Sequence, residues 1–216
     1  MNASPRSWAI ASIQAALRRP LPGPEGQRRM APSHRPPPEL YTNHSRGCRR
    51  AAVLLLLYPH QGELYTVLTA RRRDLPDHPG QVSLPGGARQ GRETVEQTAL
   101  REAQEELGLD AAQVTPLGRL THLYIRPSHF CLQIVVGYTP HRPVWRPAAH
   151  EVAEVIETPI AHFLDPANQA SEDRLIDGQV RFIPFYRLGS HEVWGATAMV
   201  IAEFTAVLEA IDVPPA

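Results

Sequence analysis

The chain has 216 residues, of which 43% are hydrophobic, and its formal net charge is zero. This length and apolar content suffice for one domain with a hydrophobic core. The neutral charge argues against a nucleic-acid-binding or membrane-surface protein, since both need a basic field. The sequence shows no signal-peptide pattern and no apolar span of bilayer length, so we expect a cytoplasmic protein.

The N-terminal part differs in composition from the rest. Residues 1–18 predict a short helix with a partial apolar stripe. Residues 19–38 contain seven prolines and scattered arginines, a composition typical of an extended linker. We therefore divide the chain into an N-terminal helix and Pro/Arg-rich linker over 1–40 and a main domain over 41–216.

Cys48 and Cys131 are the only cysteines of the chain. Two are too few for the disulfide scaffold of a small secreted protein. No His/Cys cluster has the spacing of a zinc site. We therefore expect each cysteine to be a small core residue rather than a nucleophile.

The main domain alternates apolar runs with turn residues. Residues 51–58 and 64–69 predict two strands that are joined by a hairpin turn. Together with a helix after residue 94, the later segments favour a mixed sheet flanked by helices. They are predicted strands at 117–124, 131–138 and 181–188, a strand end at 151–157, a short helix at 160–164 and a terminal helix at 197–211.

A glycine-rich loop that ends at Gly87 precedes the best-defined helix of the chain. Thr94 and Gln97 have the spacing of a capping box, so we expect the helix to begin near Thr94. Gly108 stands where a left-handed helix end would fall. These signals predict a helix of about three and a half turns after the glycine loop.

This predicted helix carries Glu102, Glu105 and Glu106. At about 100° per residue, Glu102 and Glu106 lie about 40° apart on the edge of the apolar arc, and Arg101 faces the other way. Mg²⁺ takes oxygen ligands and binds through one or two carboxylates together with substrate phosphates. A solvated acidic helix with an Arg101–Glu105 ion pair is the simpler alternative, but such a pair contributes only a few tenths of a kcal/mol.

The spacing of the whole segment resembles the Nudix box, Gly-x5-Glu-x7-Arg-Glu-U-x-Glu-Glu-x-Gly-U with U apolar. The resemblance implies an α/β protein with the Nudix fold, a mixed β-sheet sandwiched between α-helices. Ala103 and Leu109 occupy the apolar positions. The fixed positions that match are Gly87, Glu93, Arg101, Glu102, Glu105, Glu106 and Gly108.

The resemblance also implies a role for each matching residue. Glu102, Glu105 and Glu106 would bind Mg²⁺ or Mn²⁺, with the carbonyl of Gly87 facing the same site. One of these glutamates would act as the base for the attacking water, and the sequence leaves open which one. Glu93 and Arg101 would support catalysis by holding the loop and orienting the carboxylates.

The segment before the box is similar to the coenzyme A pyrophosphatase branch of the family, which carries Leu-Leu-Thr-x-Arg-Ser-x3-Arg-x3-Gly-x3-Phe-Pro-Gly-Gly. Arg72 replaces the serine, Pro76 replaces the second arginine and Leu84 replaces the phenylalanine. Arg72 or Arg73 is a candidate for the missing positive charge. The matching residues are Leu68, Thr69, Arg71, Gly80, Pro85, Gly86 and Gly87.

From this segment we predict a substrate-binding set. His78 lies in the glycine loop, where contact with phosphate and loop stabilisation are both open. A further acid near the metal is expected from Glu151 or Glu154, and the sequence does not choose between them. The predicted substrate-binding residues are Arg71, Arg72, His78, Gly86 and Gly87.

The resemblance implies a Mg²⁺-dependent diphosphate hydrolase that cleaves coenzyme A or its thioesters to 4′-phosphopantetheine and adenosine 3′,5′-bisphosphate. The alternative substrates are ADP-ribose, NADH or another nucleoside diphosphate derivative. A nucleotide-binding module without catalysis is the third hypothesis, and the complete set of box carboxylates weighs against it. The expected partner is a small-molecule nucleoside diphosphate, not nucleic acid or membrane, and a homodimer is left open.

Overall fold

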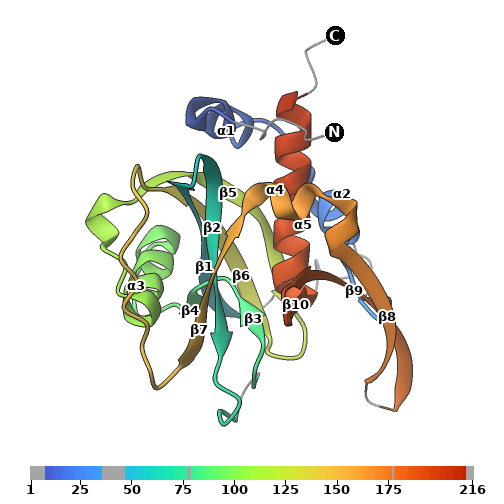
Figure 1. The fold of residues 1–216 in the computed structure, drawn as a ribbon. Helices are drawn as coiled ribbons and strands as arrows, with labels where there is room; N and C mark the ends of the chain where they lie inside the picture. Colours follow the sequence, from blue (N-terminus) through green and yellow to red (C-terminus); the bar gives the residue numbers. More distant parts are fainter. Residues whose placement is uncertain (1–7, 36–46, 77–78, 177, 213–216) are drawn as a thin grey trace.

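The computed structural model describes residues 8–35, 47–76, 79–176 and 178–212 (Figure 1). Its helices are α1 (Ile10–Ala16), α2 (Gly23–Arg28), α3 (Val95–Leu107), α4 (Ile160–Leu164) and α5 (Gly195–Asp212), with 3₁₀ turns η2 (Ala111–Gln113) and η3 (Pro166–Asn168). Its strands are β1 (Arg49–His60), β2 (Glu63–Arg71), β3 (Val82–Ser83), β4 (Gly86–Ala88), β5 (Thr115–Ile125), β6 (Phe130–Tyr138), β7 (Val152–Pro159), β8 (Gln169–Ile176), β9 (Gln179–Leu188) and β10 (His191–Trp194).

The larger sheet is mixed and lies between helices. Its strand order is β3-β2-β1-β6-β5, with β4 also paired to β1 and β7 to β2. β1 and β6 are parallel, and the other pairs are antiparallel. α3 covers one face of this sheet and α5 the other (Figure 1). The predicted class, an α/β fold with a mixed sheet between helices, is confirmed.

The central strand β1 is apolar on both of its faces because both faces are covered. Leu54 and Leu56 pack into the cluster beneath α3, and Leu55 and Leu57 pack into the cluster beneath α5. All four are essentially inaccessible to solvent. A continuous apolar run, instead of alternation, is the pattern expected of a strand buried on two sides.

The predicted ends of α3 are confirmed in atomic detail. Thr94 Oγ1 accepts a hydrogen bond from the Gln97 N–H at 3.2 Å, and Gln97 Oε1 accepts one from the Thr94 N–H at 2.8 Å. Gly108 ends the helix with φ of 67°, a left-handed conformation that glycine adopts without a Cβ penalty. These local signals fix where α3 begins and ends, and so where Glu102 and Glu106 stand along it.

Residues 8–35, the described section of the N-terminal part, are folded against α5. Trp8, Ile13 and Met30 belong to the core cluster on that side of the sheet. Residues 19–35 therefore differ from the predicted extended linker, because part of this stretch forms α2, for which prolines at the helix start are suited. The boundary predicted at residue 40 lies outside the described residues and stays a prediction.

One buried polar network attaches α2 to the domain. Gln27 Nε2 donates to Glu203 Oε2 at 2.8 Å and to the Thr121 carbonyl at 3.2 Å. Glu203 Oε1 accepts from the Thr121 N–H at 3.0 Å. The three residues link α2, α5 and β5, so α2 is part of the packed structure.

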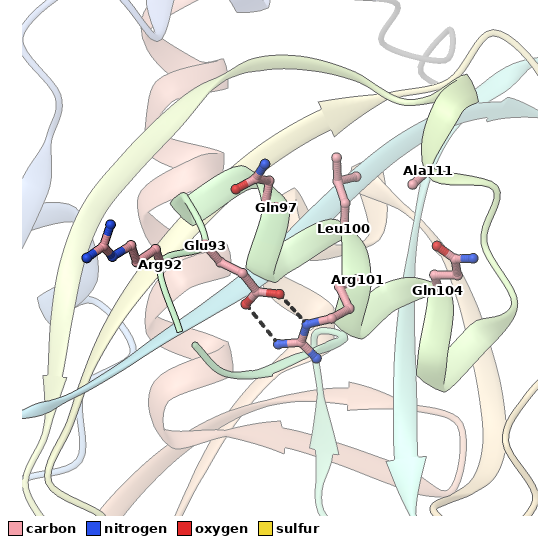
Figure 2. A pocket seen from close by; sticks show the side chains of 7 residues that line it. All are labelled: Arg92, Glu93, Gln97, Leu100, Arg101, Gln104 and Ala111. Carbon is pink, nitrogen blue, oxygen red and sulfur yellow. Dashed lines mark hydrogen bonds and ion pairs between the residues drawn. The ribbon is translucent and has the colours of Figure 1, made fainter. Parts of the chain in front are cut away.

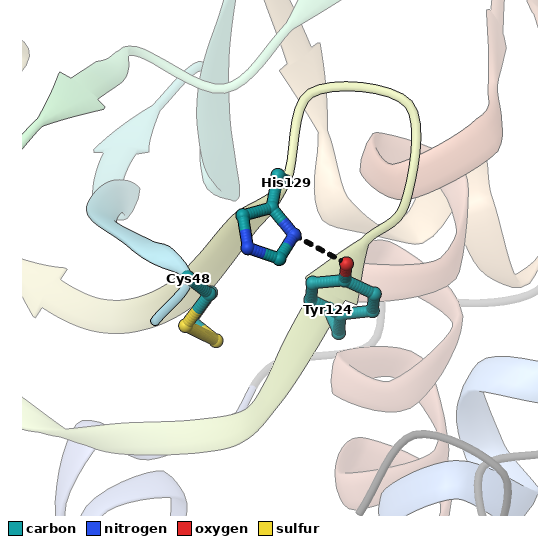
Figure 3. The surroundings of a disulfide bond; sticks show 4 residues. Cys48, Tyr124 and His129 are labelled. Atoms are coloured by element: carbon teal, nitrogen blue, oxygen red, sulfur yellow. Dashed lines mark hydrogen bonds between the residues drawn. A yellow bond between two sulfur atoms is a disulfide. The ribbon is translucent and has the colours of Figure 1, made fainter. Parts of the chain in front are cut away.

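The cysteines form a disulfide and both are half-buried, which corrects the expectation that each is a small core residue. Cys48 and Cys131 are bonded with their Cα atoms 5.7 Å apart (Figure 3). The parallel register of β1 and β6 places Arg50 beside Cys131, so the residue just before β1 lies within reach of the start of β6. The sequence separation of 83 residues gives no local signal for this pairing.

A smaller sheet, in the order β10-β9-β8, projects from the α5 side of the molecule (Figure 1). Ser33 is hydrogen-bonded to β9 at Phe182. The Ser33 N–H donates to the Phe182 carbonyl and the Ser33 Oγ accepts from the Phe182 N–H, both at 3.0 Å.

Among the described residues, none of the helices combines the length and the apolar character of a bilayer-spanning segment.

The disulfide generates a prediction about stability. Reduction with dithiothreitol should lower the free energy of unfolding by roughly 2–4 kcal/mol, because the bond closes a long loop of the unfolded chain. Chemical denaturation with and without the reductant measures this difference. The double variant C48S/C131S should be as stable as the reduced protein and insensitive to the reductant. Equal midpoints for the oxidised and reduced protein would contradict the assignment.

Candidate active site

The candidate site lies where α3 meets β4 and the turn before β7. Glu106 is its most buried acid, since only 7% of the residue is exposed. The Gly86 N–H donates a hydrogen bond to its carboxylate, but its Oε2 atom is buried without a hydrogen-bond partner in the described part of the chain. Burial, together with the charges of Glu151 and Glu102, raises the pKa of Glu106 to about 8, against the opposing effects of the Gly86 N–H and Arg71. A buried carboxylate in this state favours a proton or a cation.

Glu102 lies one helical turn before Glu106, against the backbone of Gly87. A Cβ atom at Gly87 would stand 2.6 Å from Glu102 Cδ and 2.6 Å from its Oε2, closer than carbon and oxygen pack. Gly87 is therefore required for the position of this carboxylate. Burial raises the pKa of Glu102, against the opposing effect of Arg101.

Arg101 connects the glycine loop to α3. Its Nε lies 2.6 Å from Glu93 Oε1, and its Nη2 donates to the Ala88 carbonyl at 3.0 Å. Its Nη1 lies 2.9 Å from both Glu102 Oε1 and Glu105 Oε2. The guanidinium therefore restrains the loop after β4 and orients two of the three box carboxylates.

Glu93 is held as an ionised carboxylate. Arg101 and the Gln90 N–H, which donates to Glu93 Oε2 at 2.9 Å, lower its pKa to about 2. Figure 2 shows Glu93 and Arg101 bonded at the side of α3, beside a shallow hollow on the outer face of the helix. Neither Glu102 nor Glu106 lines this hollow, so it is separate from the acidic site.

Glu105 is arranged differently from the other two acids. Its side chain is 55% exposed and forms the i,i+4 ion pair with Arg101 that the simpler alternative predicts. It still lies near enough to Glu102 to raise the pKa of that group. Within the described residues, no three His, Cys, Asp or Glu side chains gather into a complete metal site. The structure thus brings Glu102 and Glu106 together and leaves Glu105 at the rim.

Glu151, and not Glu154, is the downstream acid of this site. The charge of Glu151 acts on both Glu102 and Glu106, and its Oε1 forms an ion pair with Arg71. Glu154 instead bonds His191 Nε2 at 2.8 Å, on the side of β10. The irregular register between Ala70 and Arg71 shifts the start of β7, and this irregularity has no signal in the sequence.

The predicted substrate-binding residues occupy distinct places. Arg71 joins the acidic site through Glu151. Gly86 is forced by close packing, since a Cβ there would stand 2.4 Å from the Ala52 carbonyl oxygen. Arg72 forms an ion pair with Asp74, with 2.6 Å between Arg72 Nη2 and Asp74 Oδ2. His78 lies outside the described residues, so its predicted contact stays untested.

The donor set fits a hard divalent cation. Glu102 and Glu106 are carboxylates one helical turn apart, and Glu106 has a buried oxygen without a hydrogen-bond partner among the described residues. Because Gly87 has no side chain, its backbone lies close to Glu102. Mg²⁺ and Mn²⁺ prefer such oxygen ligands, and Mg²⁺ completes its shell with water and substrate phosphate. An incomplete protein ligand set is therefore compatible with this kind of site.

Residues 48–178 match the family model of the NUDIX domain, which is more than half of the chain. The chain belongs to the Nudix family. This membership agrees with the Nudix box expected over Gly87 to Leu109 and with the mixed sheet between α3 and α5.

Curated Nudix relatives match most of the chain. Nudix hydrolase 15, mitochondrial, from Arabidopsis thaliana is 34% identical over 178 residues, which cover 78% of this chain and 61% of that protein. Mitochondrial coenzyme A diphosphatase NUDT8 from Homo sapiens is 37% identical over 164 residues, covering 73% of this chain and 68% of that protein. The chain therefore spans less than two thirds of the plant relative and about two thirds of the human one.

Among solved Nudix structures, the crystal structure of a C. elegans Ap4A hydrolase binary complex resembles this chain with a TM-score of 0.51. The sequence identity is 15%, and the match covers 75% of this chain and 98% of that one. At this identity the likeness shows the fold alone.

The two adjacent glycines should respond differently to alanine. Gly86→Ala places a Cβ against backbone and should destabilise the fold by several kcal/mol, roughly as overpacking in a tight core does. Gly87→Ala meets only the movable carboxylate of Glu102, so the fold should persist while Mn²⁺ affinity falls about tenfold or more. Thermal unfolding and Mn²⁺ titration measure the two effects. Wild-type Mn²⁺ affinity in a folded Gly87→Ala variant would refute the proposed contact.

Glu106 generates a pH-dependence of stability in metal-free protein. Its pKa is raised from 4.5 to about 8. The contribution of Glu106 to the free energy of unfolding is therefore complete below about pH 4.5 and is lost as the pH rises through about 8. The loss should be on the order of a few kcal/mol. Denaturation in a chelator between pH 5 and about pH 9 measures it. Glu106→Gln, which cannot ionise, should flatten most of this decline, and an equally steep decline in that variant would contradict the assignment.

Proposed function

We propose that this Nudix protein is a diphosphate hydrolase that cleaves coenzyme A or its thioesters to 4′-phosphopantetheine and adenosine 3′,5′-bisphosphate. The human relative is named as a coenzyme A diphosphatase, and the similarity covers 73% of this chain. The observation that carries the proposal is the pairing of Glu102 with the buried Glu106 beside Gly87. That arrangement suits a metal-assisted attack on a diphosphate.

The residues proposed to hold the cation are Glu102, Glu106 and the Gly87 carbonyl, with Glu105 as a further ligand at the rim. A bound Mg²⁺ or Mn²⁺ would neutralise the diphosphate and lower the pKa of a coordinated water. Glu106 is buried in the site with its Oε2 unpaired, whereas the side chain of Glu105 is 55% exposed at the rim. We therefore favour it over Glu105 as the group that accepts a proton from the attacking water.

The supporting residues keep these groups in position. Arg101 and Glu93 connect the glycine loop to α3, so they fix the distance between backbone and carboxylates. Arg71 lies at the other side of the site, bonded to Glu151. We propose that substrate phosphate competes with Glu151 for Arg71, because Arg binds phosphate and carboxylate with the same donor geometry.

The type of substrate, the cellular location and the oligomeric state are also proposals. We expect a small-molecule substrate. The cytoplasmic location and the homodimer are hypotheses from the sequence. The two relatives are both named as mitochondrial proteins. The location predicted from the sequence therefore stays a prediction that fractionation of the source cells can test.

A substrate panel tests the proposed reaction. With Mg²⁺, the protein should cleave coenzyme A and acetyl-coenzyme A faster than ADP-ribose, NADH or diadenosine polyphosphates. Glu106→Gln should lower kcat by about a hundredfold or more, since it removes a ligand and the proposed base. Glu209→Gln on α5, which is paired with Arg29 at 2.6 Å, is the matched control that should keep wild-type turnover.

Each result of the panel has a distinct meaning. Cleavage of ADP-ribose or NADH alone would assign the same acids to a different substrate. Folded, metal-binding protein with no turnover on any diphosphate would favour a nucleotide-binding role. Undiminished turnover in Glu106→Gln would show that the site lies elsewhere.

A further inference from the structure

A second hollow lies directly beside the acidic site. It is open to solvent and is formed by the loop after β2 and by the turn that leads into β7. The Arg72 N–H donates to the Glu151 carbonyl at 3.1 Å, so the walls of the hollow are continuous with the Arg71–Glu151 pair. The residues that line it are Arg72, Arg73, Asp74, Ala149, Val152 and Ala153.

The side chain of Arg72 lines this hollow and is held there by hydrogen bonds. Its Nε and Nη2 donate to the two carboxylate oxygens of Asp74 at 2.8 Å and 2.6 Å, and its Nη1 donates to the Ala149 carbonyl at 2.8 Å. Arg72 in turn lowers the pKa of Asp74, so that carboxylate is ionised and compensates the guanidinium. This residue therefore shapes the hollow without supplying net charge.

Arg73 supplies the uncompensated charge. In the described part of the chain no carboxylate lies within ion-pair distance of it, and its residue is exposed. Its stem is supported at the base, because a Cβ at Gly80 would stand 3.3 Å from Arg73 Cγ and 3.7 Å from its Nε. Among the described residues that line the hollow, the charges of Arg72 and Asp74 compensate each other, and Arg73 leaves a net positive charge.

We propose that this hollow binds a phosphomonoester on the ribose of the substrate, and that Arg73 determines the preference for it. A guanidinium with free donors matches the oxygens of a phosphate dianion. Arg71 and Arg73 are two residues apart in the chain, so a nucleotide whose diphosphate lies at the acidic site has its ribose close to this hollow. This inference rests on the proposed function and extends it to the third phosphate of coenzyme A.

Direct binding of the nucleotide product tests the inference without turnover. Adenosine 3′,5′-bisphosphate and AMP, which lacks the 3′-phosphate, are titrated into the wild type by calorimetry. The wild type should prefer the bisphosphate by about tenfold, the value of one good charge-assisted contact. Arg73→Gln should reduce this ratio to about one. Asp74→Asn should increase it, because the variant removes the negative charge and releases Arg72.

Controls separate this inference from the proposed reaction. Arg181→Gln on the distant hairpin β8–β9 should keep the wild-type ratio. The kcat/KM ratio for coenzyme A over dephospho-coenzyme A should fall in Arg73→Gln in the same proportion as the binding ratio. An unchanged binding ratio in folded Arg73→Gln, or no preference in the wild type, would overturn the inference. An Arg73-dependent binding ratio without turnover of coenzyme A would retain the inference and refute the proposed reaction.

Discussion

The carboxylate of Glu106 imposes the central constraint on this structure. A carboxylate with an unpaired oxygen in a nearly closed site is unfavourable when it is ionised and alone. It can take up a proton, which its raised pKa reflects, or it can be balanced by a cation. The neighbouring Glu102 and Glu151 increase the repulsion. A site that gathers negative charge in this way is adapted to a positively charged ligand.

The rest of the fold maintains this arrangement against that repulsion. The capping box and Gly108 fix the ends of α3, so Glu102 and Glu106 are presented one turn apart. The β1–β4 pairing holds Gly86 and Gly87 beneath them. Packing of the apolar side of α3 against β1 is the stabilising counterpart, because it buries side chains that are nearly inaccessible to solvent. The packing of the core thus offsets the repulsion between the carboxylates of the site.

Features that depend on local sequence were predictable, and those that depend on tertiary contacts were not. The ends of α3 and the faces of Glu102 and Arg101 follow from capping residues and helical periodicity. The choice of Glu151 over Glu154 depends on a register irregularity between two strands. The Cys48–Cys131 bond depends on the parallel pairing of β1 and β6.

Residues 19–35 and the arginines of the loop after β2 also depend on tertiary contacts that the sequence does not reveal. The proline content of residues 19–35 suggested a linker, whereas buried contacts of Gln27 and Met30 hold this stretch on the α5 side of the domain. Arg72 and Arg73 were equivalent candidates for positive charge in the sequence. Only the bidentate contact with Asp74 distinguishes the one that is compensated from the one that is available.

The most direct test of the central claim is a crystal structure of the protein soaked with Mn²⁺, with anomalous scattering used to locate the metal. The account predicts an anomalous peak in contact with both Glu102 and Glu106, with the Glu106 oxygen that is unpaired here among the ligands. A peak elsewhere, or Glu106 left without contact to the metal, would contradict the assignment of this acidic cluster as the reactive centre.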